Sequence, residues 1–302
     1  MKSNRNSKYL SSVFEGGNQN DPLEWIVFLI RPIWPRIELE LIREIHWDLV
    51  SIFVGTDGDF KKTTMPYHNL RHTLMTVLAT VRLFHGLRCN GVEVTEKTLL
   101  QGLLSAYFHD SGMLVKKTDT ATSGSKYLKN HETRSIVFLQ NYLIAKKLPA
   151  ELGDGCETII RYTAIKSDPE TFKPHLREIR LAGQVVGSAD ILAQMADRYY
   201  LESLPLLFQE QKAGGINEYS TPIELMERTA YFYYNIALKR LVTKFPLTAT
   251  AMRAHFLKQH AIDRDLYLEN IRNNIRYLKK ILINCRKTDC LDQHLRRKPP
   301  LI

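Results

Sequence analysis

The chain has 302 residues, of which 44% are hydrophobic and 25% are charged, and its formal net charge is +10. A chain of this length buries about three quarters of its unfolded surface, which is enough for one large domain or two. Its four cysteines have no Cys-x-x-Cys spacing and are too few to stabilise a chain of this length by disulfides, so we expect a reducing, cytoplasmic compartment. The sequence has no Gly-rich phosphate loop, and ATP or NAD chemistry is therefore unsupported.

The N-terminal residues are polar and include no apolar core of signal-peptide length. The apolar run at 23–30 is too short to span a bilayer, and the pattern at 25–30 does not separate helix from strand. We therefore expect a soluble protein with a polar tail at 1–20, one helical domain at 21–285 and a basic tail at 286–302.

Apolar residues recur at helical spacing along most of the chain, and no comparable series of alternating strands appears. The sequence therefore predicts an all-α fold. The helical stripes cover residues 37–53, 70–87, 99–114, 135–148, 183–200, 223–245 and 266–285.

Two histidines stand four residues apart where the stripe at 70–87 begins. Positions i and i+4 share one face of a helix, so His68 and His72 are expected on one helix and in one site. Pro66 suits the opening of that helix.

Further candidate ligands follow apolar surroundings later in the chain. The apolar run at 99–108 ends in His109 and Asp110, and Asp190 is also flanked by apolar residues. A carboxylate in such a setting is costly unless it is paired or bound to a metal. Imidazole with carboxylate suits Mn, Fe, Co, Ni or Zn, whereas Mg prefers an oxygen-rich shell.

These motifs, in this order, resemble the HD superfamily of metal-dependent phosphohydrolases, in particular the branch that includes the class I cyclic-nucleotide phosphodiesterases. The resemblance covers about residues 66–198 and rests on Tyr-His-Asn-x-x-His, His-Asp and Ala-Asp. It implies an HD-domain, PDEase-like helical bundle holding one or two divalent metal ions. The ligands that it implies for the first metal are His72, His109, Asp110 and Asp190. Asp110 would bridge to a second metal, and His68 would be the proton donor.

Asn130-His131-Glu132 lies between the second and the last motif. In the related phosphodiesterases this stretch carries another histidine and a preceding acidic residue, where this chain has Glu132 and Lys129. In other bacterial members of the superfamily a histidine at about this distance binds the second metal. We therefore expect His131 either to bind that metal or to orient one of its ligands.

Arg71 lies inside the first motif and Arg198 two turns beyond Asp190, so both are candidates to meet a substrate phosphate. A basic residue is nevertheless usually a solvated charge. The positive charge is densest at 272–298, which could attract nucleic acid, although a solvated helix and a frayed tail are the favoured interpretation.

The resemblance implies hydrolysis of a phosphate ester by metal-activated water, with His68 as general acid. Cyclic-nucleotide phosphodiesterases hold the purine with a glutamine about fifty residues after the last metal aspartate, but residues 224–243 contain none. The expected substrate is thus a small phosphate ester, with nucleotides among the candidates, and the polar loop at 118–126 and Arg198 are candidate specificity elements. Two alternatives stay open: an HD-type di-iron oxygenase and a non-catalytic, metal-binding regulatory module.

Overall fold

The computed structural model describes residues 22–172, 176–285 and 288–299. The tail expected at 1–20 lies outside the described residues. Within these ranges the chain is helical and contains no strand, and Phe60 and Lys116 form an isolated β-bridge. The all-α prediction is confirmed.

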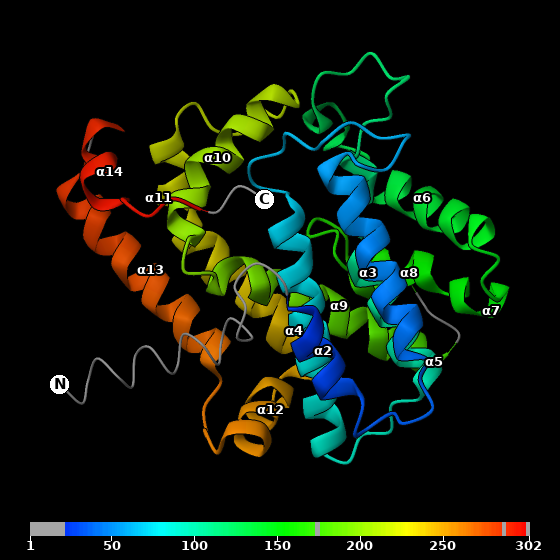
Figure 1. The fold of residues 1–302 in the computed structure, drawn as a ribbon. Helices are drawn as coiled ribbons and strands as arrows, with labels where there is room; N and C mark the ends of the chain where they lie inside the picture. The colour runs from blue at the N-terminus through cyan, green and yellow to red at the C-terminus, as the bar shows by residue number, and fades with distance from the viewer. Residues whose placement is uncertain (1–21, 173–175, 286–287, 300–302) are drawn as a thin grey trace.

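The helices follow one another along the described chain, and the connections between them include the long segments from α3 to α4 and from α5 to α6 (Figure 1). The α-helices are α2 (Leu23–Ile30), α3 (Leu39–Val54), α4 (Leu70–Cys89), α5 (Glu96–Phe108), α6 (His131–Ala145), α7 (Ala150–Gly153), α8 (Cys156–Arg161), α9 (Arg177–Ala196), α10 (Tyr200–Ala213), α11 (Pro222–Phe232), α12 (Ala251–His260), α13 (Leu266–Asn284) and α14 (Thr288–His294). Short 3₁₀ helices are η1 (Ser111–Met113), η2 (Gly124–Tyr127), η3 (Pro169–Phe172) and η6 (Pro246–Thr248), and π-helical turns are η4 (Tyr233–Ala237) and η5 (Arg240–Lys244).

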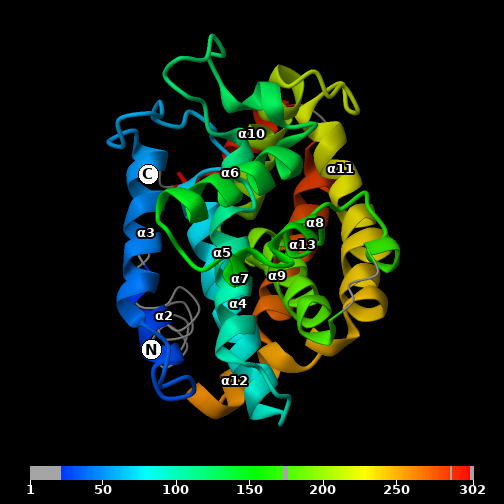
Figure 2. The same cartoon turned by 90° about the vertical axis from the view of Figure 1, so that its right-hand side faces the viewer.

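Helices α4 and α9 form the centre of the bundle. Helix α4 packs against α2, α5, α9 and α12, and α9 packs against α5, α8 and α13 as well (Figure 2). Because neighbours surround it, nearly every residue of α4 between Leu70 and Leu87 is buried. A helix that is apolar around most of its circumference is typical of such a central position. The start of α4, the end of α5 and the middle of α9 are thereby brought together, and these are the places where the sequence motifs lie.

Several boundaries differ from the apolar stripes. The ambiguous run at 25–30 is part of helix α2. The stripe at 223–245 is α-helical only to Phe232 and continues as the π-helical turns η4 and η5. The stripe at 183–200 ends as a helix at Ala196, where the chain turns before α10. Apolar residues keep recurring where an α-helix changes to a π-helical or other turn, so the apolar pattern does not show where the α-helix ends.

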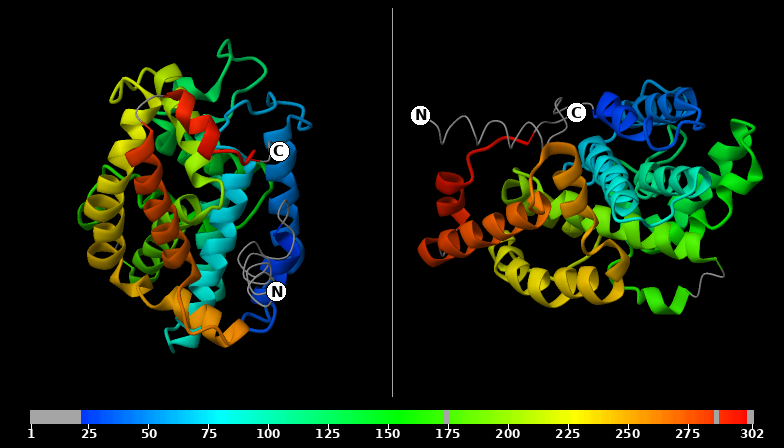
Figure 3. Two further views of the ribbon diagram at one scale, coloured as in Figure 1. Left: turned by 90° about the vertical axis from the view of Figure 1, so that its left-hand side faces the viewer. Right: turned by 90° about the horizontal axis from the view of Figure 1, so that it is seen from below.

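The C-terminal part of the described chain packs on the bundle. One continuous apolar core extends from Leu23 in α2 to Leu291 in α14, and α13 and α14 lie together at one side of the molecule (Figure 3). A disulfide joins Cys285, directly after α13, to Cys290 in α14, while Cys89 and Cys156 are free. The segment expected as a basic tail at 286–302 thus includes a helix with a buried leucine. No helix in the described ranges has the length and apolarity needed to cross a membrane.

Candidate metal centre

The first motif lies at the N-terminus of α4. The side chain of Asn69 caps the helix, accepting a hydrogen bond from the backbone N–H of His72 at 3.1 Å. The helix therefore begins at Leu70, and His68 lies outside it. The expectation that His68 and His72 share a helical face, with Pro66 opening the helix, is wrong. A capping asparagine between the two histidines explains the difference, since the capping residue has extended backbone geometry.

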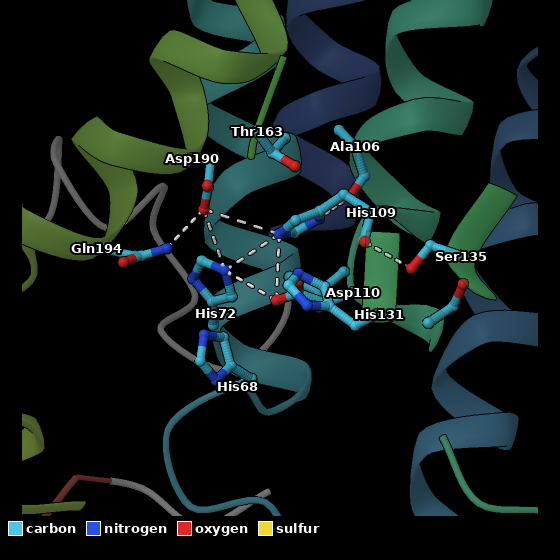
Figure 4. A network of polar contacts seen from close by, with 12 residues as sticks. His68, His72, Ala106, His109, Asp110, His131, Ser135, Thr163, Asp190 and Gln194 are labelled. Atoms are coloured by element: carbon cyan, nitrogen blue, oxygen red, sulfur yellow. Dashed lines mark hydrogen bonds and ion pairs between the residues drawn. The ribbon is translucent and has the colours of Figure 1, made fainter. Parts of the chain in front are cut away.

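Four predicted ligands meet in one buried group (Figure 4). The Nε2 atoms of His72 and His109 are 3.2 Å apart. Asp110 Oδ2 lies 3.3 Å from the first of these nitrogens and 3.2 Å from the second. Asp190 Oδ1 approaches the same two nitrogens at 3.3 and 3.7 Å. The structure thus brings together residues from α4, the end of α5 and α9, as the order of the motifs predicts.

Hydrogen bonds orient two of these side chains. The Nδ1–H of His109 donates to the carbonyl oxygen of Ala106 at 2.8 Å, which directs a lone pair of Nε2 into the group. Gln194 donates to Asp190 Oδ1 at 2.6 Å and accepts from the hydroxyl of Tyr67 at 3.0 Å. This role of Gln194 was not predicted from the sequence, although its position four residues after Asp190 on a helix was a usable signal.

Asp110 faces histidines on two sides. Its Oδ2 atom points to His72 and His109, while its Oδ1 atom is 3.6 Å from Nε2 of His131. The Nδ1–H of His131 donates to the carbonyl oxygen of Leu128 at 2.8 Å, so the lone pair of Nε2 is directed away from that bond. Glu132 contacts His131 Nδ1 at 3.4 Å. A carboxylate placed in this way has one oxygen for each of two neighbouring cations.

The position of His131 follows from how α6 docks on the turn after His109. Ser135 Oγ donates to the carbonyl oxygen of His109 at 2.6 Å and accepts from the N–H of Gly112 at 2.8 Å. A Cβ atom at Gly112 would lie 2.1 Å from the carbonyl oxygen of His131, so only glycine permits this approach. The small residues Gly112 and Ser135 therefore set the distance between His131 and Asp110.

The residues of this group fit a divalent cation. Asp110 Oδ2 is buried and has no hydrogen-bond partner among the described residues, although imidazole nitrogens surround it. Burial alone would raise the pKa of Asp110, but His109 and His72 hold that pKa well below its usual value. For His72 burial has the opposite effect and would lower the pKa, yet Asp110 and Asp190 raise that pKa to about 10. The carboxylates thus stabilise a positive charge here, and two imidazoles with two carboxylates are a usual ligand set for a transition metal.

His68 is held beside this group by a residue that the sequence analysis did not identify. Glu210, on α10, is buried and lies 2.7 Å from Nδ1 of His68 through its Oε2 atom. Its Oε1 atom accepts the backbone N–H groups of Tyr67 and His68 at 2.6 and 3.2 Å. Burial would lower the pKa of His68, but the charge and hydrogen bond of Glu210 outweigh burial and raise that pKa. The ring centre of His68 lies 6.0 Å from that of His72 and 6.5 Å from that of His131.

The two candidate phosphate ligands have different surroundings. An open pocket beside His72 includes Arg71 in its wall, but the Arg71 guanidinium forms an ion pair with Asp197 at 2.8 Å. Arg198 is exposed, lies over the ring of Tyr199 and is not part of this wall. The loop at 118–126 also contributes nothing to it, and Thr118 and Asp119 line a different cavity.

Comparison of the chain with protein-family models, curated proteins and solved structures found no match.

Proposed function

We propose that this chain is a metal-dependent phosphohydrolase with an HD-type helical bundle around its site. The proposal is supported above all by the position of His68. This histidine is held by a buried glutamate next to a buried group of two histidines and two aspartates. A proton donor beside a group that can bind a metal suits hydrolysis of a phosphate ester whose leaving group is an alkoxide.

In this proposal His72, His109, Asp110 and Asp190 would hold one ion. A second ion, if bound, would be held by Asp110 and His131. When bound, such ions would polarise a phosphoryl oxygen and make water a stronger nucleophile near neutral pH. The two imidazoles of the first set favour Mn, Fe, Co, Ni or Zn over Mg, which prefers an oxygen-rich shell.

His68 supplies the proton that the leaving alkoxide needs. Because Glu210 fixes Nδ1–H of the ring, the proton to be transferred is the one on Nε2. The negative charge of the glutamate favours the protonated ring before the reaction, and a positioned general acid contributes about 10²–10⁴ in rate.

The substrate in this proposal is a small phosphate ester, and nucleotides remain candidates. The net charge of +10 attracts anions. The pocket beside His72 is lined by aromatic, amide and hydroxyl side chains, including Tyr67, Gln194 and Ser203, rather than by free basic residues. Such side chains suit hydrogen bonding to the organic part of the ester.

The glutamate behind His68 favours hydrolysis over the two alternatives. A regulatory module that uses its metal structurally has no need for a proton donor beside the site. A di-iron oxygenase needs oxygen and an organic substrate, whereas nothing in the Glu210 and His68 arrangement serves oxygen activation. The two classes give different products, so they can be separated by experiment.

The test begins with the full chain freed of metal and reloaded with each candidate ion separately. Phosphate monoesters and diesters are then assayed for released phosphate or alcohol, with and without oxygen. We expect hydrolysis that is independent of oxygen and is lost in Asp110→Ala. Hydrolysis of no ester with any ion, or turnover only in the presence of oxygen, would contradict the proposal.

A second experiment tests the proton donor. His68→Ala should keep its metal and lose about 10²–10⁴ in turnover of an alkyl ester. The loss should shrink for a nitrophenyl ester, because nitrophenolate leaves without a proton. Equal losses for the two esters would remove His68 from this role.

A further inference from the structure

A second group of metal-binding side chains lies at the C-terminal side of the bundle. Cys285 follows the last residue of α13, and Cys290 and His294 are on α14. Their two sulfurs and a ring nitrogen of the histidine all lie within 4.8 Å of one another. This group shares no residue with the His72 centre.

We propose that Cys285, Cys290 and His294, after reduction of the disulfide, form a second metal site that binds Zn²⁺ or a similarly thiophilic ion. Thiolate and imidazole are the ligands typical of zinc, whereas harder cations such as Mg²⁺ and Ca²⁺ bind to carboxylate-rich sites. The spacing Cys-x₄-Cys is within the usual range for paired zinc ligands. The proposal does not depend on the proposed hydrolase activity.

The fold places these ligands before any ion arrives. The Cα atoms of the two cysteines are 5.4 Å apart, close enough for both sulfurs to reach one ion. Cys290 and His294 are four residues apart on α14, so they share one helical face. Leu291, next to Cys290, is buried in the core and so fixes the orientation of α14. The hydroxyl of Tyr277 donates to the carbonyl oxygen of His294 at 3.3 Å.

The reaction that forms the site balances with an added dithiol reductant. The reductant gives two electrons and two protons to the Cys285–Cys290 bond and becomes a disulfide itself. When the ion binds, the two thiols release their protons to water and the neutral imidazole contributes a lone pair. Two thiolates neutralise the charge of a divalent ion, and the fourth position is left to water. The ion then joins α13 to α14, as the disulfide does in the oxidised chain.

Cobalt provides a probe that separates this site from the His72 centre. Cobalt bound to thiolate absorbs strongly in the near ultraviolet through sulfur-to-metal charge transfer, and the His72 centre contains no sulfur ligand. The full chain, oxidised or reduced and then freed of reductant, is titrated with Co²⁺ and afterwards with Zn²⁺. We expect the charge-transfer band only in the reduced chain, saturating at about one ion per chain and removed by Zn²⁺.

Matched variants test the ligands. Cys290→Ser and His294→Ala should weaken or abolish the band, whereas Cys89→Ser, which changes an exposed free cysteine, should leave it intact. Zn²⁺ should also protect Cys285 and Cys290 from alkylation in the reduced wild-type chain, a result that needs no variant to fold. Absence of the band together with unprotected cysteines would overturn the proposal and leave the pair with a structural disulfide alone. A band that is insensitive to His294→Ala would overturn the assignment of the histidine.

Discussion

The Oε2 atom of Glu210 lies 2.7 Å from Nδ1 of His68, and the two residues are 142 positions apart in the sequence. The same carboxylate binds the backbone N–H groups of Tyr67 and His68, so it holds both the ring and the segment that carries it. Glu210 is buried, and a buried carboxylate is stable only with such partners. A residue from a distant helix therefore orients His68 and raises its pKa.

Replacing the carboxylate should weaken the proton donor without removing the metal. In Glu210→Gln the amide can still accept from the backbone, but it supplies no negative charge to His68 and the pKa of that ring should fall. We expect turnover of an alkyl ester to drop by about 10–100-fold and the basic limb of its pH profile to move to lower pH.

The matched control is Glu202→Gln, which changes another glutamate of α10 that has no contact with His68. It should leave turnover unchanged. The double variant His68→Ala, Glu210→Gln should be no slower than His68→Ala alone, because both changes remove one function. A multiplicative loss would assign Glu210 a separate role.

The sequence predicts the centre well where the ligands follow local patterns. His109, Asp110 and Asp190 each interrupt an apolar run, and the cost of burying a charge makes such positions informative. Gln194 could have been found too, from its spacing to Asp190. Glu210 could not, because it lies among Gln209, Gln211 and Lys212 in a polar stretch that resembles a solvated helix.

The limits on fold prediction have a similar cause. Apolar periodicity identified the long central helix α4, because apolar residues recur along its whole length. It did not locate the start of that helix, because the side chain of Asn69 decides this by capping. It also did not separate α11 from the π-helical turns that follow Phe232, since the same apolar stripe continues through them.

The two sides of Asp110 predict different effects on metal content. Asp110→Ala should lose both ions of the proposed centre, because one carboxylate oxygen faces His72 and the other faces His131. His131→Ala should lower the content from about two ions per chain to about one, and Glu132→Gln should leave it close to that of the wild type. Metal analysis after gel filtration checks this, with circular dichroism as the test of folding. Full metal content in Asp110→Ala would show that the ions bind elsewhere.

Cyclic AMP and cyclic GMP should be poor substrates. Residues 224–243 contain no glutamine, and none of them lines the pocket beside His72. A site that lacks a required hydrogen-bonding partner can discriminate by as much as about 10⁴–10⁵. The check is kcat/KM for cyclic nucleotides, nucleoside monophosphates and simple diesters with the best metal. A value above about 10⁵ M⁻¹s⁻¹ for a cyclic nucleotide would show that another residue holds the base.

Acid should destabilise the fold through histidines outside the metal centre. Burial and the nearby charges of His260 and Lys258 lower the pKa of His85 to about 4, and burial lowers that of His255 well below its usual value. In the unfolded chain both pKa values return to about 6.5, so the unfolded state binds more protons below that pH. Their contribution to stability is complete above about pH 6.5 and is lost as the pH falls toward 4.

The size of this effect can be measured with His85→Gln. One pKa unit corresponds to about 1.4 kcal/mol, and solvent screening reduces the effect of a partly exposed group, so His85 should contribute at most about 3 kcal/mol to the acid-dependent loss. Urea unfolding of wild type and variant is compared between pH 7.5 and 4.5 with EDTA present, so that loss of metal does not contribute. The free energy of unfolding should fall less steeply with acid in the variant. Parallel pH dependences would mean that His85 titrates normally in the folded chain and that its burial between α4 and α12 does not suppress protonation.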